Sequence, residues 1–409
     1  MEASRAPQLS SVPAHVAAER IVDLDIYATP GGETDSIRPW LSLRDSTSFK
    51  MLWSPRNGGH WITLDSDQIP KILADSDRFS SEVMVLPREM SEATKLIPVQ
   101  SDPPEHTHYR AIIAKEMSAK YIMALKEPLE EVATMLIDKF RGRGKCEFVA
   151  DFSSQFPVYV FFVLAGLPRE DAQRLHDHAT QMTRPDGSVT PEQFITVLDG
   201  YLAPRVLERM KNPGEDLLSR VISKPVNGRP MTIEEANRIC RTLLLGGLDT
   251  VTSLMGFVAL FLAGHPEYQE QLRGNPRIVA GAADELLRRF PFLVLARVAR
   301  CDMEFDGVTV KKNEIVMVPT MLHNLDPNLF EDPKDVRFDR GLKAHSTMGN
   351  GIHRCVGASL ARAELIAFLD VWHKLMPTVR VDPNDKVVHR SGAANAVSYL
   401  PLVWDVPST

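Results

Sequence analysis

Cys355 lies in a stretch whose composition suits the binding of a large, flat cofactor. Residues 348–357 read Met-Gly-Asn-Gly-Ile-His-Arg-Cys-Val-Gly, so glycines and two cationic-capable side chains surround the cysteine. Glycines allow the backbone to pass close to a ligand and to adopt positive φ. The amphipathic stretch 358–369 predicts a helix, whose N-terminal amides favour a thiolate at the sulfur. A thiolate of this kind can be an axial ligand of haem iron. The alternative interpretation is a small, buried structural cysteine.

A second stretch places an acid and an alcohol inside an apolar helix. Residues 246–250 read Gly-Gly-Leu-Asp-Thr, in the middle of a long apolar segment. A buried carboxylate needs partners, and each glycine costs a helix about 1 kcal/mol relative to alanine. One interpretation is a kinked core helix whose threonine bonds to its own backbone. The other is a widened turn that makes room for O₂, where Asp249 and Thr250 handle protons.

Two further stretches pair charged groups at helical spacing. Glu285 and Arg288 lie at i, i+3 on one helix face, where they are either an ordinary surface pair or a structural ion pair. In residues 102–110, two prolines start a helix on which His106 and Arg110 fall at i, i+4. This pair is either a solvated cationic face or a set of donors for an anion.

Composition excludes several classes of protein. The net charge of −6 and the lack of a basic run give no reason to expect nucleic acid as a partner. The four cysteines lack paired spacing, which argues against a disulfide framework or a zinc site and favours a reduced, cytoplasmic compartment; they are Cys146, Cys240, Cys301 and Cys355.

Two segments could attach the chain to a membrane by position or length, and neither is predicted to do so. Residues 1–20 are polar, resemble neither a signal peptide nor an anchor, and are expected to be disordered. Residues 243–263 approach the length of a membrane span but carry Asp249, which costs about 2.5–3.5 kcal/mol on insertion scales. We therefore expect a buried core helix and a soluble protein without a membrane partner.

The periodicity predicts a mainly α protein with a minor β-portion, in a single domain over residues 21–409. No linker rich in glycine or serine divides the chain. The expected elements are a hairpin of strands 51–53 and 61–64, helices over 121–140 and 192–210, a long helix that opens with a capping box at residue 232 and ends before residue 265, and a β-meander over 303–319.

Together, the four stretches resemble the bacterial cytochrome P450 family. The cysteine loop is similar to F-x-x-G-x-x-x-C-x-G, with Met348 in place of the aromatic residue, and the others are similar to [AG]-G-x-[DE]-T, E-x-x-R and D-P-P-x-H-x-x-x-R. The resemblance runs from about residue 53 to the C-terminus. It is closer to the camphor-hydroxylase branch, with which residues 182–187, 246–251 and 400–404 are shared nearly verbatim.

The resemblance implies a haem-thiolate monooxygenase with the cytochrome P450 fold. Cys355 would be the ligand of the iron of haem b, and four side chains would bind the propionates: His106, Arg110, Arg297 and His353. Catalysis would involve Asp249 and Thr250, with Arg184 paired to the aspartate to gate proton entry and His176 as a further partner.

The resemblance also outlines the substrate pocket. The side chains expected to line it are Val85, Thr94, Val99, Thr183, Thr242, Leu245, Leu293, Ala393 and Ala394. Thr94 stands where the camphor enzyme has a tyrosine that holds the ketone, and Leu295 replaces an acidic residue near a propionate. A roomier, apolar pocket favours a terpenoid or norisoprenoid ketone such as an ionone, with camphor as the second choice.

Electrons would come from a [2Fe–2S] ferredoxin and its FAD-dependent reductase. Arg110 and Arg362 are the expected docking charges, although Arg362 is equally interpreted as an ordinary helix-face arginine. Two rival functions are a peroxide-driven haem-thiolate enzyme, which the intact Asp249-Thr250 pair disfavours, and a non-catalytic haem sensor or carrier.

Overall fold

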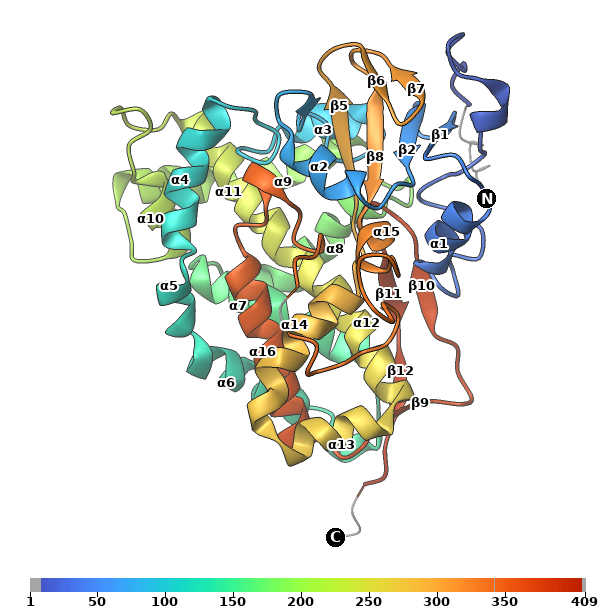
Figure 1. The fold of residues 1–409 in the computed structure, drawn as a ribbon. Helices are drawn as coiled ribbons and strands as arrows, with labels where there is room; N and C mark the ends of the chain where they lie inside the picture. The colour runs from blue at the N-terminus through green and yellow to red at the C-terminus, as the bar shows by residue number, and fades with distance from the viewer. Residues whose placement is uncertain (1–8, 342, 407–409) are drawn as a thin grey trace.

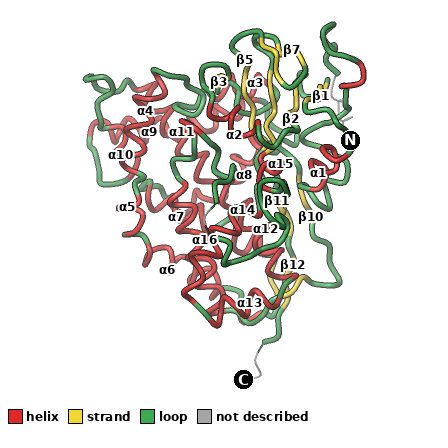
Figure 2. The backbone as a smooth tube through the Cα atoms, in the orientation of Figure 1, coloured by secondary structure: helices red, strands yellow, loops and turns green. Residues whose placement is uncertain are grey.

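Helices fill one side of the molecule and a five-stranded sheet lies on the other, in a computed structural model that describes residues 9–341 and 343–406 (Figures 1 and 2). The first helices are α1 (Arg38–Asp45), α2 (Gln68–Ala74), α3 (Arg88–Thr94), α4 (Glu105–Glu116), α5 (Ala119–Met123), α6 (Lys126–Asp138), α7 (Phe156–Leu164), α8 (Ala172–Thr183) and α9 (Pro191–Lys211). The later helices are α10 (Leu217–Ile222), α11 (Ile233–Leu248), α12 (Thr250–Gly264), α13 (Pro266–Gly274), α14 (Val279–Arg289), α15 (Thr320–Asn324) and α16 (Ala358–Leu375).

The main sheet has the order β1-β2-β8-β5-β3, and three smaller sheets are formed by β10-β11, β4-β12-β9 and β6-β7. The strands are β1 (Met51–Ser54), β2 (His60–Thr63), β3 (Phe79–Ser80), β4 (Lys145–Glu147), β5 (Val294–Ala299), β6 (Met303–Phe305), β7 (Val308–Val310), β8 (Ile315–Pro319), β9 (Arg380–Val381), β10 (Val388–Arg390), β11 (Ala396–Tyr399) and β12 (Pro401–Val403). The expected mainly α fold with a minor β-portion is confirmed.

The first hairpin forms as the sequence predicts. β1 and β2 pair antiparallel, with Trp53 opposite Trp61. The turn between them carries Asn57, Gly58 and Gly59 at positive φ, the backbone region that glycine enters without steric cost.

The predicted β-meander over 303–319 is wrong in one strand. β6 and β7 form a separate hairpin, whereas β8 enters the main sheet between β2, to which it is parallel, and β5. All five residues of β8 are buried, so the strand has the apolar character of a sheet interior instead of an alternating edge.

The long apolar helix begins where the capping box predicts. The Thr232 side chain accepts a hydrogen bond from the Glu235 amide at 3.2 Å, and the Glu235 carboxylate accepts one from the Thr232 amide at 2.7 Å. The segment ends at Gly264 and is interrupted at Asp249, which separates α11 from α12. Within the described chain, this stretch is the one long and apolar enough to cross a membrane, and most of it is buried inside the protein. Its apolar character therefore belongs to the core.

One other expectation needs correction. The helix predicted over 121–140 divides into α5 and α6.

The N-terminal segment expected to be disordered is described only in part, because residues 1–8 lie outside the described residues. Residues 9–20 are mostly exposed and contact the rest of the fold at a few points. The amide of Ser10 donates to the Pro55 carbonyl at 2.9 Å, Val16 is buried, and the His15 ring lies 3.0 Å from the Glu314 carboxylate.

The loop before α16 lies between two hydrophobic cores. One core fills the helical side and the other packs on the main sheet. Met348 and Val356 of the loop pack against the helical core, while its short 3-10 turn, Gly351–His353, contacts α2 on the sheet side. Cys355 is thus held by both halves of the fold.

Candidate active site

The Cys355 loop is a tight turn that depends on its glycines. Gly349 and Gly351 both have φ of +67°, and a Cβ on Gly351 would lie 2.5 Å from the Ala74 backbone. The amide of Cys355 donates to the Met348 carbonyl at 2.7 Å, and the Arg354 amide donates to Gly351 at 3.1 Å. This geometry fixes the cysteine directly before the first turn of α16.

Hydrogen bonds to neighbouring segments anchor the start of the loop. The Asn324 side chain accepts from the Ser346 amide at 2.8 Å and donates to the Thr347 hydroxyl at 2.7 Å. Thr347 in turn donates to the Leu287 carbonyl of α14 at 2.6 Å. The Arg288 carbonyl accepts from the Asn324 amide group at 2.9 Å. The loop is therefore tied to α14 and α15.

Glu285 and Arg288 form a buried, structural ion pair instead of an ordinary surface pair. Their side chains are 3% and 2% exposed and meet at 2.8 Å, and Arg340 adds a second contact to Glu285 at 2.9 Å. Arg288 also donates to the carbonyls of Asn324 at 3.1 Å and Pro333 at 2.9 Å. The pair attaches the segment after α15 to α14, so its role is to stabilise the fold.

The surroundings of the Cys355 sulfur suit metal ligation. The side chain is accessible although it lies deep in the protein, as expected for a group that faces an internal cofactor space. Burial raises the pKa of the Cys355 thiol, while the Gly357 amide and the charges of Arg110 and Arg354 act in the opposite direction. A metal ion that binds the sulfur would stabilise the thiolate.

The four residues expected at the propionates come together in one cluster. The rings of His106, on α4, and His353, in the cysteine loop, lie 4.3 Å apart between centroids. Burial, together with the charges of Arg297, His106 and Arg110, lowers the pKa of His353 to about 3. Burial likewise lowers the pKa of Arg297 to about 10.

Some nitrogen atoms of this cluster have no hydrogen-bond partner among the described residues. Buried polar groups in a packed core are normally paired, whereas a binding site leaves such groups for its ligand. The His106 Nδ1 and His353 Nε2 atoms are buried, and no described residue bonds to them. Arg297 is 6% exposed and donates to its neighbouring Ala296 carbonyl at 2.8 Å. Arg110 donates to the Arg354 carbonyl. Two buried histidine nitrogens without partners, beside the cationic side chains of Arg297 and Arg110, fit the two propionates of haem.

Asp249 lies at the break between α11 and α12 and is paired with Arg184, as the resemblance implies, and also with Thr183, which was expected only in the pocket. Arg184 donates to one carboxylate oxygen, and the Thr183 hydroxyl donates to the other at 2.6 Å. Burial raises the pKa of Asp249, but the charge of Arg184 and these hydrogen bonds outweigh it, so the pKa lies below its ordinary value. His176 is buried nearby, and its charge acts on Asp249 in the same direction. The aspartate is therefore an anion.

Arg184 joins three parts of the fold at this point. Besides Asp249, it donates to the Ser253 hydroxyl at 3.2 Å and to the Ala394 carbonyl at 2.7 Å. Its side chain is only 9% exposed. The Thr250 hydroxyl donates to the Gly246 carbonyl at 3.1 Å, across the glycine pair. Thr250 thus bonds to its own helix, as expected for a kinked core helix, and also faces a cavity, as expected for a widened turn beside an O₂ site.

A cavity of about 160 Å³ lies over this break in the helix, and its lining is almost entirely apolar. Nine of the residues singled out from the sequence line it: Val85, Val99, Thr183, Thr242, Leu245, Asp249, Thr250, Leu293 and Ala393. The lining residues that the sequence analysis did not assign to the pocket are Met84, Leu96, Ala179, Met182, Gly246, Val294 and Leu295. The spacing of Ala179, Met182 and Thr183 along α8 was the available signal, since i, i+3 and i+4 share a helix face. Leu295 belongs to this apolar wall.

Two predicted lining residues do not face the cavity. The Thr94 hydroxyl donates toward Gln100 Oε1 at 2.9 Å and the Ser91 carbonyl at 3.1 Å, so its short side chain is satisfied within its own segment. Ala394 is buried, pairs in a β-bridge with Leu293, and offers its carbonyl to Arg184. Ala394 therefore contributes its carbonyl to the surroundings of Arg184 and no side chain to the pocket.

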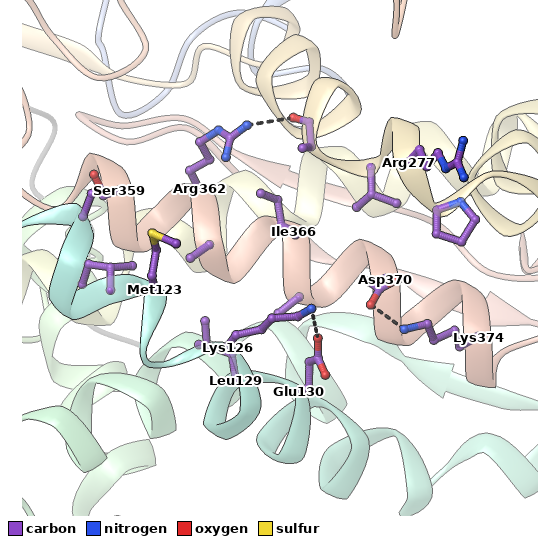
Figure 3. A pocket seen from close by; sticks show the side chains of 17 residues that line it. Met123, Lys126, Leu129, Glu130, Arg277, Ser359, Arg362, Ile366, Asp370 and Lys374 are labelled. Atoms are coloured by element: carbon purple, nitrogen blue, oxygen red, sulfur yellow. Dashed lines mark hydrogen bonds and ion pairs between the residues drawn. The ribbon is translucent and has the colours of Figure 1, made fainter.

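A second, larger hollow of about 700 Å³ lies along α16, between this helix and α5, α6 and the start of α14 (Figure 3). Arg362 at its rim is paired with Asp284 at 2.6 Å, and Lys126 and Lys374 contact Glu130 and Asp370 at 3.8 and 2.6 Å. Arg277 is exposed, and no described residue pairs with its guanidinium group. The face that follows Cys355 thus carries four cations around an apolar hollow.

Comparisons with known proteins agree with this geometry. A family model described as cytochrome P450 matches residues 198–372. The chain is 30% identical to nocardicin C N-oxygenase of Nocardia uniformis over 84% of the chain and 89% of that protein, and 28% identical to probable cytochrome P450 127A1 of Sinorhizobium fredii over 96% and 97%. Among solved structures, it is similar to cytochrome P450 CYP101C1, with 45% identity, a TM-score of 0.91 and coverage of 97% and 100%, and to CYP101J2, with 35% identity, a TM-score of 0.89 and the same coverage.

These likenesses extend over nearly the whole chain and include the segments that build the cysteine loop, the cationic cluster and the Asp-Thr helix. The fold and the residues available to hold a thiolate-bound haem both support the same family assignment. The chain belongs to the cytochrome P450 family, as a haem b-dependent monooxygenase.

Proposed function

We propose that this monooxygenase hydroxylates a small apolar terpenoid or norisoprenoid, such as an ionone, with electrons from a [2Fe–2S] ferredoxin. The observation that carries the proposal is the apolar cavity of about 160 Å³ over Thr250, whose few polar side chains are already engaged. Thr183 donates to Asp249, and Thr242 donates to the Arg238 carbonyl at 3.0 Å. A pocket of this kind selects a guest by apolar contact and shape, at about 25 cal/mol per Å² buried.

The departure at Thr94 supports an ionone over camphor. The camphor enzyme uses a tyrosine hydroxyl to hold its ketone, whereas Thr94 turns its hydroxyl to Gln100. A net hydrogen bond is worth about 0.5–1.5 kcal/mol, so camphor loses an anchor that a larger apolar guest does not need. Camphor remains the second candidate because residues 182–187 and 246–251 are shared nearly verbatim with the camphor-hydroxylase branch.

In this proposal, haem supplies the activation of O₂ and the protein supplies the ligand, the proton route and the pocket. Cys355 binds the iron, and the propionates are held by His106, Arg110, Arg297 and His353. Asp249 carries protons from the side of Arg184, whose bonds to three groups hold it at the entry. The Thr250 hydroxyl passes them into the cavity that it lines.

The ferredoxin would dock on the face around α16, because this helix starts beside the iron ligand. Arg362 and Arg110, the docking charges expected from the sequence, are partly engaged by Asp284 and by the Arg354 carbonyl. Around the hollow of Figure 3, Arg277 adds an exposed positive charge that no described residue pairs, and the exposed Lys126 and Lys374 contact Glu130 and Asp370. An acidic partner with an apolar tip fits this combination, and the FAD-dependent reductase would serve that partner.

The substrate proposal is tested by spectral titration of the purified protein with β-ionone and with camphor. We expect β-ionone to bind more tightly and to give the larger low-to-high-spin shift, and a reconstituted system to hydroxylate it with NADH. Tighter binding and better coupled turnover of camphor would overturn the ionone assignment while leaving the monooxygenase assignment intact. Haem without NADH-dependent turnover of any terpenoid would instead favour a carrier or sensor.

A further inference from the structure

The segment 81–102 forms a loop that is closed on itself and supplies one wall of the cavity. At its base, the Ser81 amide donates to the Asp102 carboxylate at 3.1 Å. Inside it, the Gln100 side chain accepts from the Leu96 amide at 2.7 Å and donates to the Ser91 carbonyl at 2.7 Å. The cavity residues that this loop provides are Met84, Val85, Leu96 and Val99. The loop is thus held together by hydrogen bonds between its own residues.

One buried arginine ties this loop to the helices on the far side of the cavity. Arg241 lies on α11, directly before the cavity residue Thr242, and its side chain is 7% exposed. It donates to the Thr94 carbonyl at the C-terminal end of α3 and to the Asp199 carboxylate of α9. The Arg241 Nε atom is buried, and no described residue bonds to it.

The position of Arg241 gives this tether its strength. The last carbonyls of a helix carry partial negative charge and lack partners within the helix, so a guanidinium group is a favourable cap. Asp199 is 41% exposed and supplies the opposite charge from outside. On the other side of the loop, Tyr27 donates to the Leu86 carbonyl, and Arg88 donates to the Asn313 carbonyl at 2.9 Å. The wall is therefore held from the sheet and, through Arg241, from the helices.

We propose that Arg241, with Asp199, is a positioning residue that holds the 81–102 wall closed over the cavity and so sets both the exchange rate and the orientation of the guest. The inference rests on the proposed function only in taking this cavity as the substrate site. Arg241 touches no reacting atom. It acts through Thr94 on the wall residues that the guest contacts, and its hydrogen bonds connect three elements, α3, α9 and α11.

The test measures exchange of a ligand that does not depend on the identity of the substrate. Phenylimidazole enters the pocket and binds haem iron, so its association and dissociation rates can be followed by stopped-flow absorbance. In Arg241→Gln and in Asp199→Asn we expect both rates to rise, by about tenfold in the arginine variant, which corresponds to about 1.4 kcal/mol of lost closure. With β-ionone at saturation, both variants should give a broader product mixture and lower coupling.

The matched control is Glu234→Gln, which removes an ion pair to Arg238 within α11 without touching the loop. Its ligand rates and product mixture should equal those of the wild type. Because Asp199 is half-exposed, Asp199→Asn leaves no cavity. Its ligand rates therefore test the tether even if Arg241→Gln loses stability. Unchanged phenylimidazole rates in Asp199→Asn and Arg241→Gln, at unaltered haem content, would overturn the tether. Failure of β-ionone as a substrate would bear on the proposed function alone.

Discussion

At the scale of single residues, the assignment of the iron ligand is the sharpest prediction. Thiolate donation shifts the Soret band of the reduced carbon monoxide complex to longer wavelength than histidine ligation does. We expect Cys355→Ser to lose this band, because an alcohol in the same position does not donate as a thiolate. Cys240→Ser is the control, since that thiol is fully buried away from the loop. Persistence of the band in Cys355→Ser would contradict the ligand assignment.

The acid and the alcohol of the interrupted helix should fail in different ways. Thr250→Ala should still bind substrate and consume NADH, but it should divert electrons to hydrogen peroxide. Asp249→Asn should slow turnover, because the neutral amide cannot carry the proton that the Arg184-paired carboxylate carries.

Thr252→Val is the control for the alcohol, as that hydroxyl is buried and donates to the Ser153 carbonyl at 2.8 Å. Oxygen consumption, peroxide and product are measured together. Fully coupled product formation by Thr250→Ala would show that its bond to Gly246 is all the hydroxyl does.

The partners of a single side chain could be predicted where its chemistry allows only one kind of partner. An aspartate in an apolar helix needs a cation, and Arg184 fills that need. The prediction failed for Thr94, because the direction of a short hydroxyl depends on which acceptor lies nearest, here Gln100. Arg241 was missed altogether, since an arginine in the middle of a helix is usually solvated and nothing in the sequence places Asp199 beside it.

At the scale of elements, the Glu285–Arg288 pair should stabilise the attachment of the segment after α15. Glu285→Gln leaves Arg288 and Arg340 buried without a counter-charge, and we expect a loss of about 3–5 kcal/mol of unfolding free energy. Weaker haem retention should follow, because the same segment anchors the cysteine loop. Glu331→Gln, on an exposed pair with Arg337, should cost about 0–1 kcal/mol. Urea unfolding and haem transfer to an acceptor protein measure the two effects.

The same carboxylate gives a pH dependence with a definite sign. Burial raises the pKa of Glu285, but the bonds to Arg288, the Arg337 amide and Arg340 outweigh it, so the folded pKa lies below the ordinary value of 4.5. Its stabilising contribution is complete above pH 4.5 and is lost as the pH falls through the lower folded pKa. The stability difference between the wild type and Glu285→Gln should therefore be constant at neutral pH and shrink in acid. A difference that grows in acid would contradict the ion pair.

Elements with strong local signals could be predicted, and those that depend on distant partners could not. The capping box at Thr232 and the turn at Asn57 act within a few residues, so both are visible in sequence. Strand β8 was assigned to a meander because its neighbours in sequence are strands, yet it pairs with β2, more than 250 residues earlier. No local pattern carries that information.

At the scale of the whole molecule, the net charge opposes an acidic partner while the face around α16 attracts one. The chain carries a formal charge of −6, but Arg277 on the rim of the hollow along α16 is a cation that no described residue pairs. The other cations of the rim, Arg362, Lys126 and Lys374, are paired with acidic side chains. At 0.1 M salt, charges more than about 10 Å apart are largely screened from each other, so a docking ferredoxin responds mainly to the charges nearest to it. Reduction by the ferredoxin should therefore slow as salt rises, in spite of the negative net charge.

Arg277→Gln localises that effect, because no described residue pairs with this guanidinium group and its loss disturbs no internal bond. We expect the apparent KM for ferredoxin to rise by up to about fivefold at low salt, since one exposed ion pair contributes about 0.2–1 kcal/mol. The rise should vanish at high salt. Lys311→Gln is the control, as this exposed cation lies beyond β7 on the sheet side and pairs with Asp302. Equal effects of both substitutions would place the docking surface elsewhere than on the face that carries Cys355.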